Sequence, residues 1–449
     1  MKNFTFLFLF LVPLFFISCD DDDDTNESTQ DIVELAQANG FTSLATALTQ
    51  VDLISTLQSD GPFTVFAPTN EAFADLLEAV GQTSIEDVPD DVLTDILLYH
   101  VVAGSSISST EISAGTAETA EGSDITIAVG TDGITINSAN VVEPFDVVAS
   151  NGIIHTIDAV LVPDSHVQFV NTVLEPAYFN KSFSTLIEAA IKADAVGTLL
   201  NTANLTIFAP TNDAFTASGV VVADTDAADL LDVLTYHVIT SKVLSADIPA
   251  SAATLNGENI YFSLVDAGNF INGDIEISNV DIESGSGVVH VIDKVLIPEE
   301  GTVVDVAVAL SEDGEFTSLV AALTRTADEG TADQNLITVL SGDGPFTVFA
   351  PTDAAFTALL DSNDDWTTLS DIPLETLIAV LQYHVVSGRV YDKDLAGALD
   401  ANNGVTTVEG SDLTFNLTDL TINTDVNISA VNTHAANGVI HVIDAVLVP

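Results

Sequence analysis

The apolar positions after residue 30 follow helical spacing first and strand-like alternation later. One helix is predicted by apolar residues that lie three and four positions apart: Phe41, Leu44, Ala45 and Leu48. A Gly61-Pro62 turn leads into the short apolar run 63–67, which predicts a buried strand that ends at Pro68. This stretch therefore begins as a helix and continues as a strand.

Two more helices are predicted downstream of that strand. Asn70 is placed to cap the first of them. Its inward side would carry Phe73, Leu76 and Leu77. Pro89 suits the first turn of the second helix, which would end at Tyr99-His100. The inward side of this second helix would carry Val92, Leu93, Ile96 and Leu97.

The second half of the unit reads as strands. Residues 125–129 and 134–136 alternate around a Thr131-Asp132-Gly133 turn, which predicts a hairpin. Helices followed by strands are typical of an α+β domain.

The whole pattern occurs three times along the chain. The block TVFAPTNEAF at 64–73 recurs as TIFAPTNDAF at 206–215 and as TVFAPTDAAF at 347–356. Each copy is followed by a Tyr-His pair, found at Tyr99-His100, Tyr236-His237 and Tyr383-His384. Each unit closes with a Gly-x-x-His strand that ends in proline, within 151–163, 286–298 and 437–449. Repeats this long indicate separate domains with their own cores.

The repeats place the domains at 31–164, 165–299 and 300–449. The third copy has Asp353 where the others have Asn, and aspartate can also cap a helix. It is also longer, because Phe316 to Phe349 spans 33 positions where Phe41 to Phe66 spans 25. We expect the extra residues, near 326–335, to form a polar loop.

These three motifs resemble the fasciclin-like family, that is, the fasciclin type 1 domain also found in periostin and the beta-ig-h3 protein. The resemblance covers essentially all of residues 31–449. It implies an α+β fold in which a β-wedge or sandwich core is flanked by helices. It also implies a role in extracellular adhesion or ligand binding.

The N-terminus has the pattern of a secretion signal. Lys2 precedes an apolar stretch, 4–17, that is too short for a comfortable membrane span and ends at Ser18-Cys19. The box 16–19 resembles a bacterial lipoprotein cleavage site, which implies a signal peptide at 1–18 and a lipid on Cys19. The alternative is an ordinary signal peptide with an incidental cysteine.

An acidic run, Asp20–Asp24, follows Cys19 and predicts that residues 19–30 form a solvated tether. In lipoproteins of the Bacteroidetes type, such a run resembles the signal for export to the outer face of the outer membrane. We therefore expect a lipid-anchored, surface-exposed protein, with a plain acidic spacer as the alternative.

The charge balance restricts the partners. The chain has 8 Lys and Arg against 67 Asp and Glu, a formal net charge of -59. Such a surface repels phosphate backbones, so nucleic acids are not expected as partners. Diffuse, weak calcium binding is compatible with so many carboxylates.

Six of the eight histidines belong to the repeated motifs. Strand alternation places His155 on the apolar face of its strand, with Asp158 on the other face. We predict that His155, His290 and His441 are buried structural residues. In animal fasciclin-like domains the Tyr-His region is associated with receptor binding, which implies candidate binding residues at Tyr99, His100, Tyr236, His237, Tyr383 and His384. The alternative is that these pairs join buried networks.

Patterns for catalysis, cofactors and metals are weak. The chain has no His-x-x-x-His, no cysteine cluster and no nucleophile elbow, so we expect no enzyme, no cofactor and no specific metal site. Asp361 begins a run like the start of a calcium loop, but Trp366 takes the turn position and Ile372 the twelfth. The sequence favours adhesion to a cell-surface or matrix protein or polysaccharide. The alternative is an envelope-anchored module that captures a small ligand or glycan.

Overall fold

The computed structural model of this chain describes residues 29–131, 133–299, 301–312, 314–399 and 404–449. The expected signal peptide, Cys19 and most of the expected tether lie outside these residues, and so does Asp132 of the expected hairpin turn. Contacts divide the chain into two compact units. The first unit comprises the residues up to Ala74 and Thr94–Leu161, and the second comprises Asp75–Leu93 and Val162–Pro449.

Each repeat contains one seven-stranded mixed sheet with the same topology. In the first repeat the strand order is β2-β1-β7-β6-β5-β4-β3. The first long strand and the last strand of each repeat pair in parallel, and the other neighbours pair antiparallel. The α+β class predicted from the repeats is thereby confirmed.

The first repeat begins with helices and ends with a meander of strands. Its helices are α1 (Ile32–Ala38), α2 (Thr42–Gln50), α3 (Ile54–Leu57), α4 (Asn70–Ala79), the 3-10 turn η1 (Ile85–Asp87) and α5 (Asp90–Tyr99). Its strands are β1 (Phe63–Pro68), β2 (Val101–Ala103), β3 (Gly115–Glu118), β4 (Asp124–Gly130), β5 (Gly133–Ile136), β6 (Ala139–Ala149) and β7 (Gly152–Ile157). The predicted helices and strands all appear, within a few residues of their expected ends.

The second repeat has its strands in the same order and differs from the first in its short helical turns. Its helices are α6 (Asp164–Val167), α7 (Glu175–Tyr178), η2 (Lys181–Phe183), α8 (Ser184–Lys192), α9 (Val196–Asn201), α10 (Asn212–Ser218), α11 (Ala227–Tyr236) and η3 (Ser245–Asp247). Its strands are β8 (Thr206–Pro210), β9 (Val238–Ile239), β10 (Ser251–Ala253), β11 (Asn259–Val265), β12 (Gly268–Ile271), β13 (Ile275–Ser284) and β14 (Gly287–Ile292).

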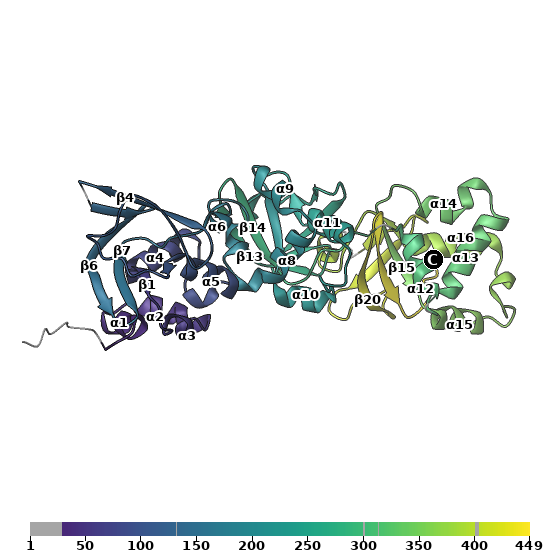
Figure 1. Cartoon of the computed structure of the whole chain (residues 1–449). Coiled ribbons are helices and arrows are strands. Elements are labelled where there is room, and N and C mark those ends of the chain that lie inside the picture. The colour runs from purple at the N-terminus through teal and green to yellow at the C-terminus, as the bar shows by residue number, and fades with distance from the viewer. Residues whose placement is uncertain (1–28, 132, 300, 313, 400–403) are drawn as a thin grey trace, which may run out of the picture. The chain divides into compact units, whose positions relative to one another are not determined.

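The third repeat differs mainly in its helices. They are α12 (Val303–Glu312), α13 (Thr317–Glu329), η4 (Ala332–Gln334), α14 (Leu336–Leu340), α15 (Asp353–Asp361), η5 (Leu369–Asp371), α16 (Leu374–Tyr383) and α17 (Leu395–Ala398). Its strands are β15 (Phe346–Pro351), β16 (Val385–Ser387), β17 (Gly404–Thr406), β18 (Asp412–Asn416), β19 (Thr421–Ile422), β20 (Val426–Ala435) and β21 (Gly438–Ile443). In Figure 1 the strands β15 and β20 lie beside the helices α12, α13, α15 and α16.

Strand alternation divides the core of the third repeat between the two faces of its sheet. Val348 and Ala350 of β15 pack into a cluster with the helices, whereas Phe349 packs into a second cluster among the strands. Because successive side chains of a strand point to opposite faces, one apolar run supplies both cores. The run is therefore buried over most of its length, as its composition predicts.

The prediction that Asn70 caps the helix that follows it is wrong. Thr69 caps α4, because its hydroxyl accepts a hydrogen bond from the backbone N–H of Ala72 at 3.0 Å. Asn70 accepts instead from the N–H of Ser43, in the first turn of α2, at 2.9 Å. Asp353 likewise accepts from Ser318 in α13 at 2.7 Å. The N-termini of α2 and α13 lack a side-chain cap from their own N-cap residues. The side-chain oxygen of Asn70 or Asp353, about thirty residues later in the chain, accepts from their free N–H groups instead.

The extra residues of the third repeat were expected to form a polar loop, and the structure corrects this. They lengthen α13 to 13 residues, against 9 for α2 and α8, and add the turn η4. Thr326 is fully buried, and its hydroxyl accepts from the N–H of Leu336 at 3.2 Å. The turn closes with a capping box between Thr331 and Gln334. The insertion is helical because its backbone groups find these partners.

An asparagine ties the closing hairpin to the N-terminal helices. In the third repeat, Asn437 accepts from the N–H of Val303 at 2.8 Å and donates to the carbonyls of Leu340 and Gly342 at 2.8 and 2.6 Å. Asn151 makes the same three contacts in the first repeat. The second repeat has Ser286 at this position, which accepts one hydrogen bond from Asn204. The closing motif is thus a structural joint between distant segments.

Candidate binding site

The histidine of each Tyr-His pair sits at the end of a helix and links it to the end of its own repeat. His100 Nδ1 lies 2.7 Å from the carbonyl oxygen of Ile96, and its Nε2 accepts from the N–H of Leu161 at 2.8 Å. His237 and His384 make the corresponding contacts with Val233 and Leu296, and with Val380 and Leu447. All three rings are buried.

These contacts define the protonation state of the three rings. A nitrogen that accepts from a backbone N–H carries no proton, so Nδ1 must carry the proton and donate to the helix carbonyl. Burial lowers the pKa of His100, His237 and His384 from 6.5 to about 4, and the bond to the helix carbonyl opposes this shift. Each ring is therefore neutral at physiological pH.

The tyrosine of each pair reaches into the strand-side core. Tyr99 donates to the carbonyl of Asp124 at 3.0 Å and accepts from Asn137 Nδ2 at 3.1 Å. Tyr236 and Tyr383 repeat this pattern with Asn272 and Asn423. Burial raises the pKa of Tyr236 to about 12. Because every polar atom of the pair has an internal partner, the pairs form buried networks in the described domains. Direct contact between these residues and a ligand stays a prediction.

The closing-strand histidines are buried on the apolar face, as predicted. His155 stacks on Phe66 with 5.9 Å between ring centroids, and its Nε2 lies 2.8 Å from the carbonyl of Ile107. His290 and His441 contact Phe208 and Phe349 in the same way, and the carbonyls of Val243 and Val390. Asp158, on the other face, accepts two hydrogen bonds from Asn140. The His155–Asp158 pair is therefore no joint ligand site.

In each repeat, the loop that follows the Tyr-His pair is hydrogen-bonded to the long strand that precedes the closing strand. We call this contact the clasp, and the sequence analysis did not predict it. In the second repeat, Asp281 accepts from the N–H and the hydroxyl of Ser245 at 2.7 and 2.5 Å. These hydrogen bonds, together with nearby His290, hold the pKa of Asp281 below its usual range, although burial acts in the opposite direction. Ser109 and Asp146 form the same clasp in the first repeat. The third repeat exchanges the residue types, with Asp392 on the loop and Asn432 on the strand.

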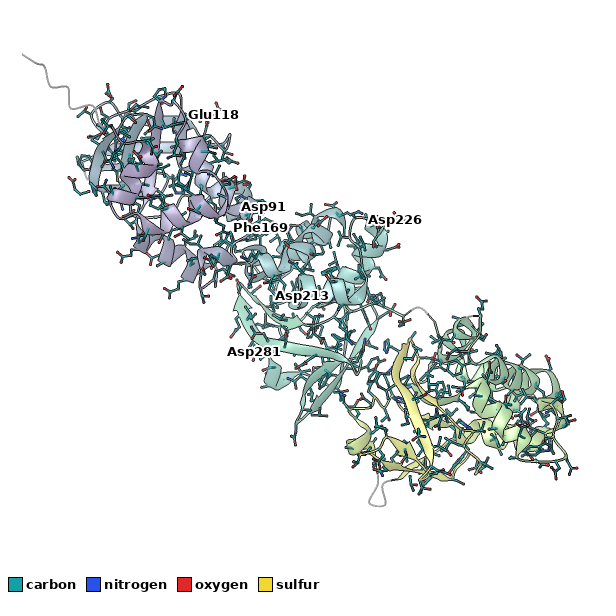
Figure 2. The ribbon with its side chains drawn as sticks, turned by 90° about the horizontal axis from the view of Figure 1, so that it is seen from below. Asp91, Glu118, Phe169, Asp213, Asp226 and Asp281 are labelled. Carbon is teal, nitrogen blue, oxygen red and sulfur yellow. The ribbon has the colours of Figure 1, made fainter. Side chains whose placement is uncertain are left out.

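The basic side chains in the described part of the chain are all engaged. Four are paired with carboxylates, in Lys242–Glu283, Lys294–Asp274, Arg325–Glu329 and Lys393–Asp392. Lys181, Lys192 and Arg389 donate to backbone carbonyls. Exposed carboxylates, by contrast, are spread over the repeats, and Glu118, Asp213 and Asp226 are examples in Figure 2. The described surface therefore has few cationic groups available to bind an anionic ligand.

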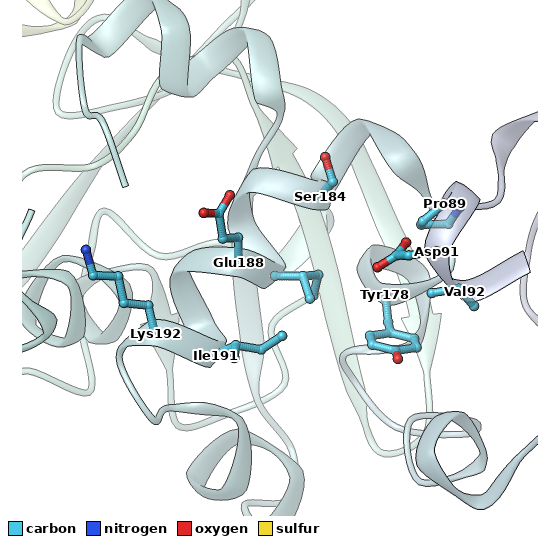
Figure 3. Close-up of a pocket in the computed structure, with 9 residues that line it drawn as sticks. Pro89, Asp91, Val92, Tyr178, Ser184, Glu188, Ile191 and Lys192 are labelled. Carbon is cyan, nitrogen blue, oxygen red and sulfur yellow. The ribbon is translucent and has the colours of Figure 1, made fainter. Parts of the chain in front are cut away.

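One cavity of about 490 Å³ lies in the second unit, against helix α8 (Figure 3). Its apolar lining includes Ile187 and Ile191, and its polar lining includes Glu188 and Lys192. The Lys192 amine already donates to the carbonyls of Val222 and Ala223 at 2.8 and 2.9 Å. The Tyr178 hydroxyl contacts His166 at 2.6 Å. Two of its polar groups are thus committed elsewhere, which leaves few to orient a small ligand.

The described residues have neither a metal-binding cluster nor a membrane-spanning helix. They contain no group of three or more His, Cys, Asp or Glu side chains arranged to hold a metal ion. None of their helices combines the length and the apolar character needed to cross a bilayer.

The fold and the buried hydrogen-bond networks define a class of protein, a tandem array of α+β domains. In these domains the repeated polar motifs make contacts within each domain. The family model for the fasciclin domain matches residues 39–163, 181–298 and 314–449. The chain therefore belongs to the fasciclin domain family.

Relatives are found among animal and bacterial proteins. The chain is 28% identical over 426 residues to transforming growth factor-beta-induced protein ig-h3 of Sus scrofa, an alignment that covers 94% of this chain and 57% of that protein. It is 27% identical over 431 residues to human periostin, which covers 94% of this chain and 47% of periostin. The chain thus spans about half the length of these two relatives. It is also 44% identical over 132 residues to the Synechocystis protein sll1735, covering 29% of this chain and 96% of that protein.

Proposed function

We propose that this protein is a surface adhesion protein whose three fasciclin domains act in series on a matrix or cell-surface protein or a polysaccharide. The presence of three complete copies of one binding-type domain in a single chain carries the proposal. Weak contacts made by several domains on one chain add through a raised effective concentration. Repetition therefore favours attachment to an extended, repetitive partner over capture of a single small molecule.

The surface chemistry narrows the partner further. With a net charge of -59 and its described basic side chains already engaged, the protein suits neutral or cationic groups. Acidic polysaccharides would need bridging by a divalent cation such as calcium, which many exposed carboxylates can bind weakly. Attachment to a neutral glycan should persist at high salt, whereas bridged attachment should be lost with a chelator.

We expect attachment to fall far more than threefold when the array is shortened to one domain. The experiment measures how much labelled soluble protein, residues 26–449, is retained on washed cells and on polysaccharide-coated surfaces. It would be done in high salt, with and without calcium. A protein ending at residue 164 should be retained about a hundredfold less, because avidity between linked modules is typically worth 10²–10⁴-fold. Circular dichroism would show that the shortened protein is folded. A loss in simple proportion to domain number would contradict serial action.

The Tyr-His pairs enter this proposal as positioning residues. They hold the helix end, the closing strand and the hairpin together, and in this way set the shape of the surface that meets the partner. A role of this kind accounts for their repetition in all three domains.

We also propose that the protein is exported and held at the bacterial outer membrane by a lipid on Cys19, with its domains facing outward. Cys19→Ser should abolish labelling by an alkyne-tagged fatty acid and move the protein from the membrane to the soluble fraction. Replacing Asp20–Asp24 with asparagine should keep the label but reduce accessibility to an external protease. A Cys19→Ser protein that still carries lipid would overturn the anchor.

The alternative, an envelope-anchored module that captures a small ligand or glycan, finds its best support in the cavity against α8. Its lining combines Val92 of α5 with Ile187 and Ile191 of α8, which gives an apolar wall for a small ligand. Saturable binding of a soluble ligand, lost on Ile187→Asp, together with no retention on any surface, would favour this second function. No catalytic role is proposed for any residue.

A further inference from the structure

The second and third domains share a contact within the second unit. The hairpin β11–β12 of domain two meets the loop after β16 and the strand β20 of domain three. We propose that this junction locks the two domains into one rigid body, so that they present their surfaces at a fixed spacing. We define the junction by Tyr261, Ser263, Phe270 and Gly273 of domain two and by Arg389, Tyr391, Lys393, Asp394 and His434 of domain three. The proposal does not depend on what the protein binds.

The guanidinium of Arg389 is held in place by its own domain. It donates to the carbonyls of Ala435 and Ala436, both at 2.9 Å, and to that of Gly438. With its edge fixed in this way, its face lies over the ring of Tyr261, 4.2 Å from the centroid. A planar cation over an aromatic face is attractive, and here little side-chain freedom is left to lose on contact.

His434 and Tyr391 complete the domain-three side. His434 Nδ1 lies 3.0 Å from Arg389 Nη1 and 2.9 Å from the Tyr391 hydroxyl. Burial and the nearby Arg389 charge lower the pKa of His434 to about 3, so the ring is neutral and accepts from both groups. The edge of Tyr261 meets the same ring with 6.3 Å between centroids.

Two further contacts cross the junction. The Ser263 hydroxyl donates to Asp394 Oδ2 at 2.8 Å, and Ser263 is fully buried. The Lys393 amine lies 5.5 Å from the ring centroid of Phe270. A buried hydroxyl that donates its hydrogen bond to the other domain indicates a specific contact, because buried polar groups need a partner.

Gly273 gives an independent sign that the junction is built in. A Cβ at this position would lie 2.4 Å from Cδ1 of Tyr391, far inside van der Waals contact. A positive φ favours glycine at this turn, yet the equivalent turn of domain three holds Thr424 at φ 81°, close to the 89° of Gly273. Both turns follow an asparagine that bonds back to the hairpin. Tyr391 and Asn432 of domain three therefore leave no space for a side chain at Gly273.

The other repeats lack the junction residues at equivalent positions. Where domain three has Arg389 and His434, domain two has Lys242 and Glu283, which pair with each other in solvent. Domain one has Ser106 and the exposed Val148. Where domain two has Tyr261 and Phe270, the siblings have threonines: Thr126 and Thr135 in domain one, Thr414 and Thr421 in domain three. One sheet face of each partner is thus specialised for the other.

Spin labels on the full soluble array test the proposal. Residues 26–449 contain no cysteine, so Asp213→Cys in domain two and Ala358→Cys in domain three give a unique pair at exposed positions. Pulsed electron resonance should give one narrow distance distribution. Gly273→Thr should broaden it severalfold, because the new side chain collides with Tyr391. The matched exchange Thr424→Gly should leave it narrow.

A second pair of variants separates the contact from folding. Arg389→Ala should broaden the distribution, whereas Lys242→Ala, at the same loop position of domain two, should not. Each variant would be checked for an unchanged circular dichroism spectrum. A broad distribution in the parent array, or a narrow one in a folded Gly273→Thr protein, would overturn the proposal.

Discussion

Lowering the pH from 7 to 4 should weaken each domain at its central histidine by about 3 kcal/mol, since one unit of pKa is worth about 1.4 kcal/mol. The pKa of His100, His237 and His384 is lowered by burial from 6.5 to about 4 in the folded domains. Between these values the unfolded chain binds the proton and the folded chain does not. The stabilisation is therefore complete above pH 6.5 and is lost as the pH falls towards 4.

The measurement is urea unfolding at several pH values between 7 and 4, with His384→Gln as the matched variant. Glutamine can donate and accept like the neutral ring but does not titrate, so the transition of the third domain should lose part of its pH dependence. The comparison is needed because protonation of the many carboxylates relieves repulsion and acts in the opposite direction. Equal pH dependence in both proteins would show that His384 titrates alike in the folded and unfolded chain.

Asn437→Ala should lower the free energy of unfolding of the third domain by about 4 kcal/mol, because each buried partner left without a hydrogen bond costs about 1–3 kcal/mol. Three such partners lose their bonds: the N–H of Val303 and the carbonyls of Leu340 and Gly342. These groups belong to α12, the end of α14 and the turn after it, so the whole helical layer should loosen from the sheet. Thermal and urea unfolding of the array would measure the loss.

The second domain supplies the comparison. Ser286 holds the corresponding position there and accepts only the hydrogen bond from Asn204, at 3.1 Å. Ser286→Ala should cost about 1 kcal/mol, as expected for a single exposed bond. If the two substitutions had the same effect, the asparagine would not be the joint that its contacts describe.

Local periodicity was enough to predict the elements. The spacing of Phe41, Leu44 and Leu48 identified α2, and the apolar run before Pro68 identified β1, because both signals reside in a few adjacent residues. Repetition then extended these elements to three domains without further assumptions. The buried face of His155 followed from strand alternation in the same way.

Partners far apart in sequence were beyond that reasoning. Asn70 has the right chemistry for a cap, but the helix that it caps lies earlier in the chain. The Ser245–Asp281 clasp joins residues 36 positions apart, and neither residue stands out in its own segment. The junction could not be predicted for a similar reason, because its two sides lie in different domains. In the sequence, Tyr261 has the pattern of an ordinary outward-facing strand residue. Comparison with the sibling threonines is the signal that could have found it.

The parallel pairing of the first and last long strands has a mechanical consequence. In the first domain Phe63 pairs with Gly152 and Pro68 pairs with Ile157, and the other two domains repeat this arrangement. Tension enters at the start of β1 and leaves at the end of β7, which are opposite ends of the strand pair. The evenly spaced hydrogen bonds are then loaded together in shear, rather than opened one by one as in a pulled hairpin. Helices α1 and α2 lie outside this pair and should unravel first, so each domain can lengthen under load while its sheet stays closed.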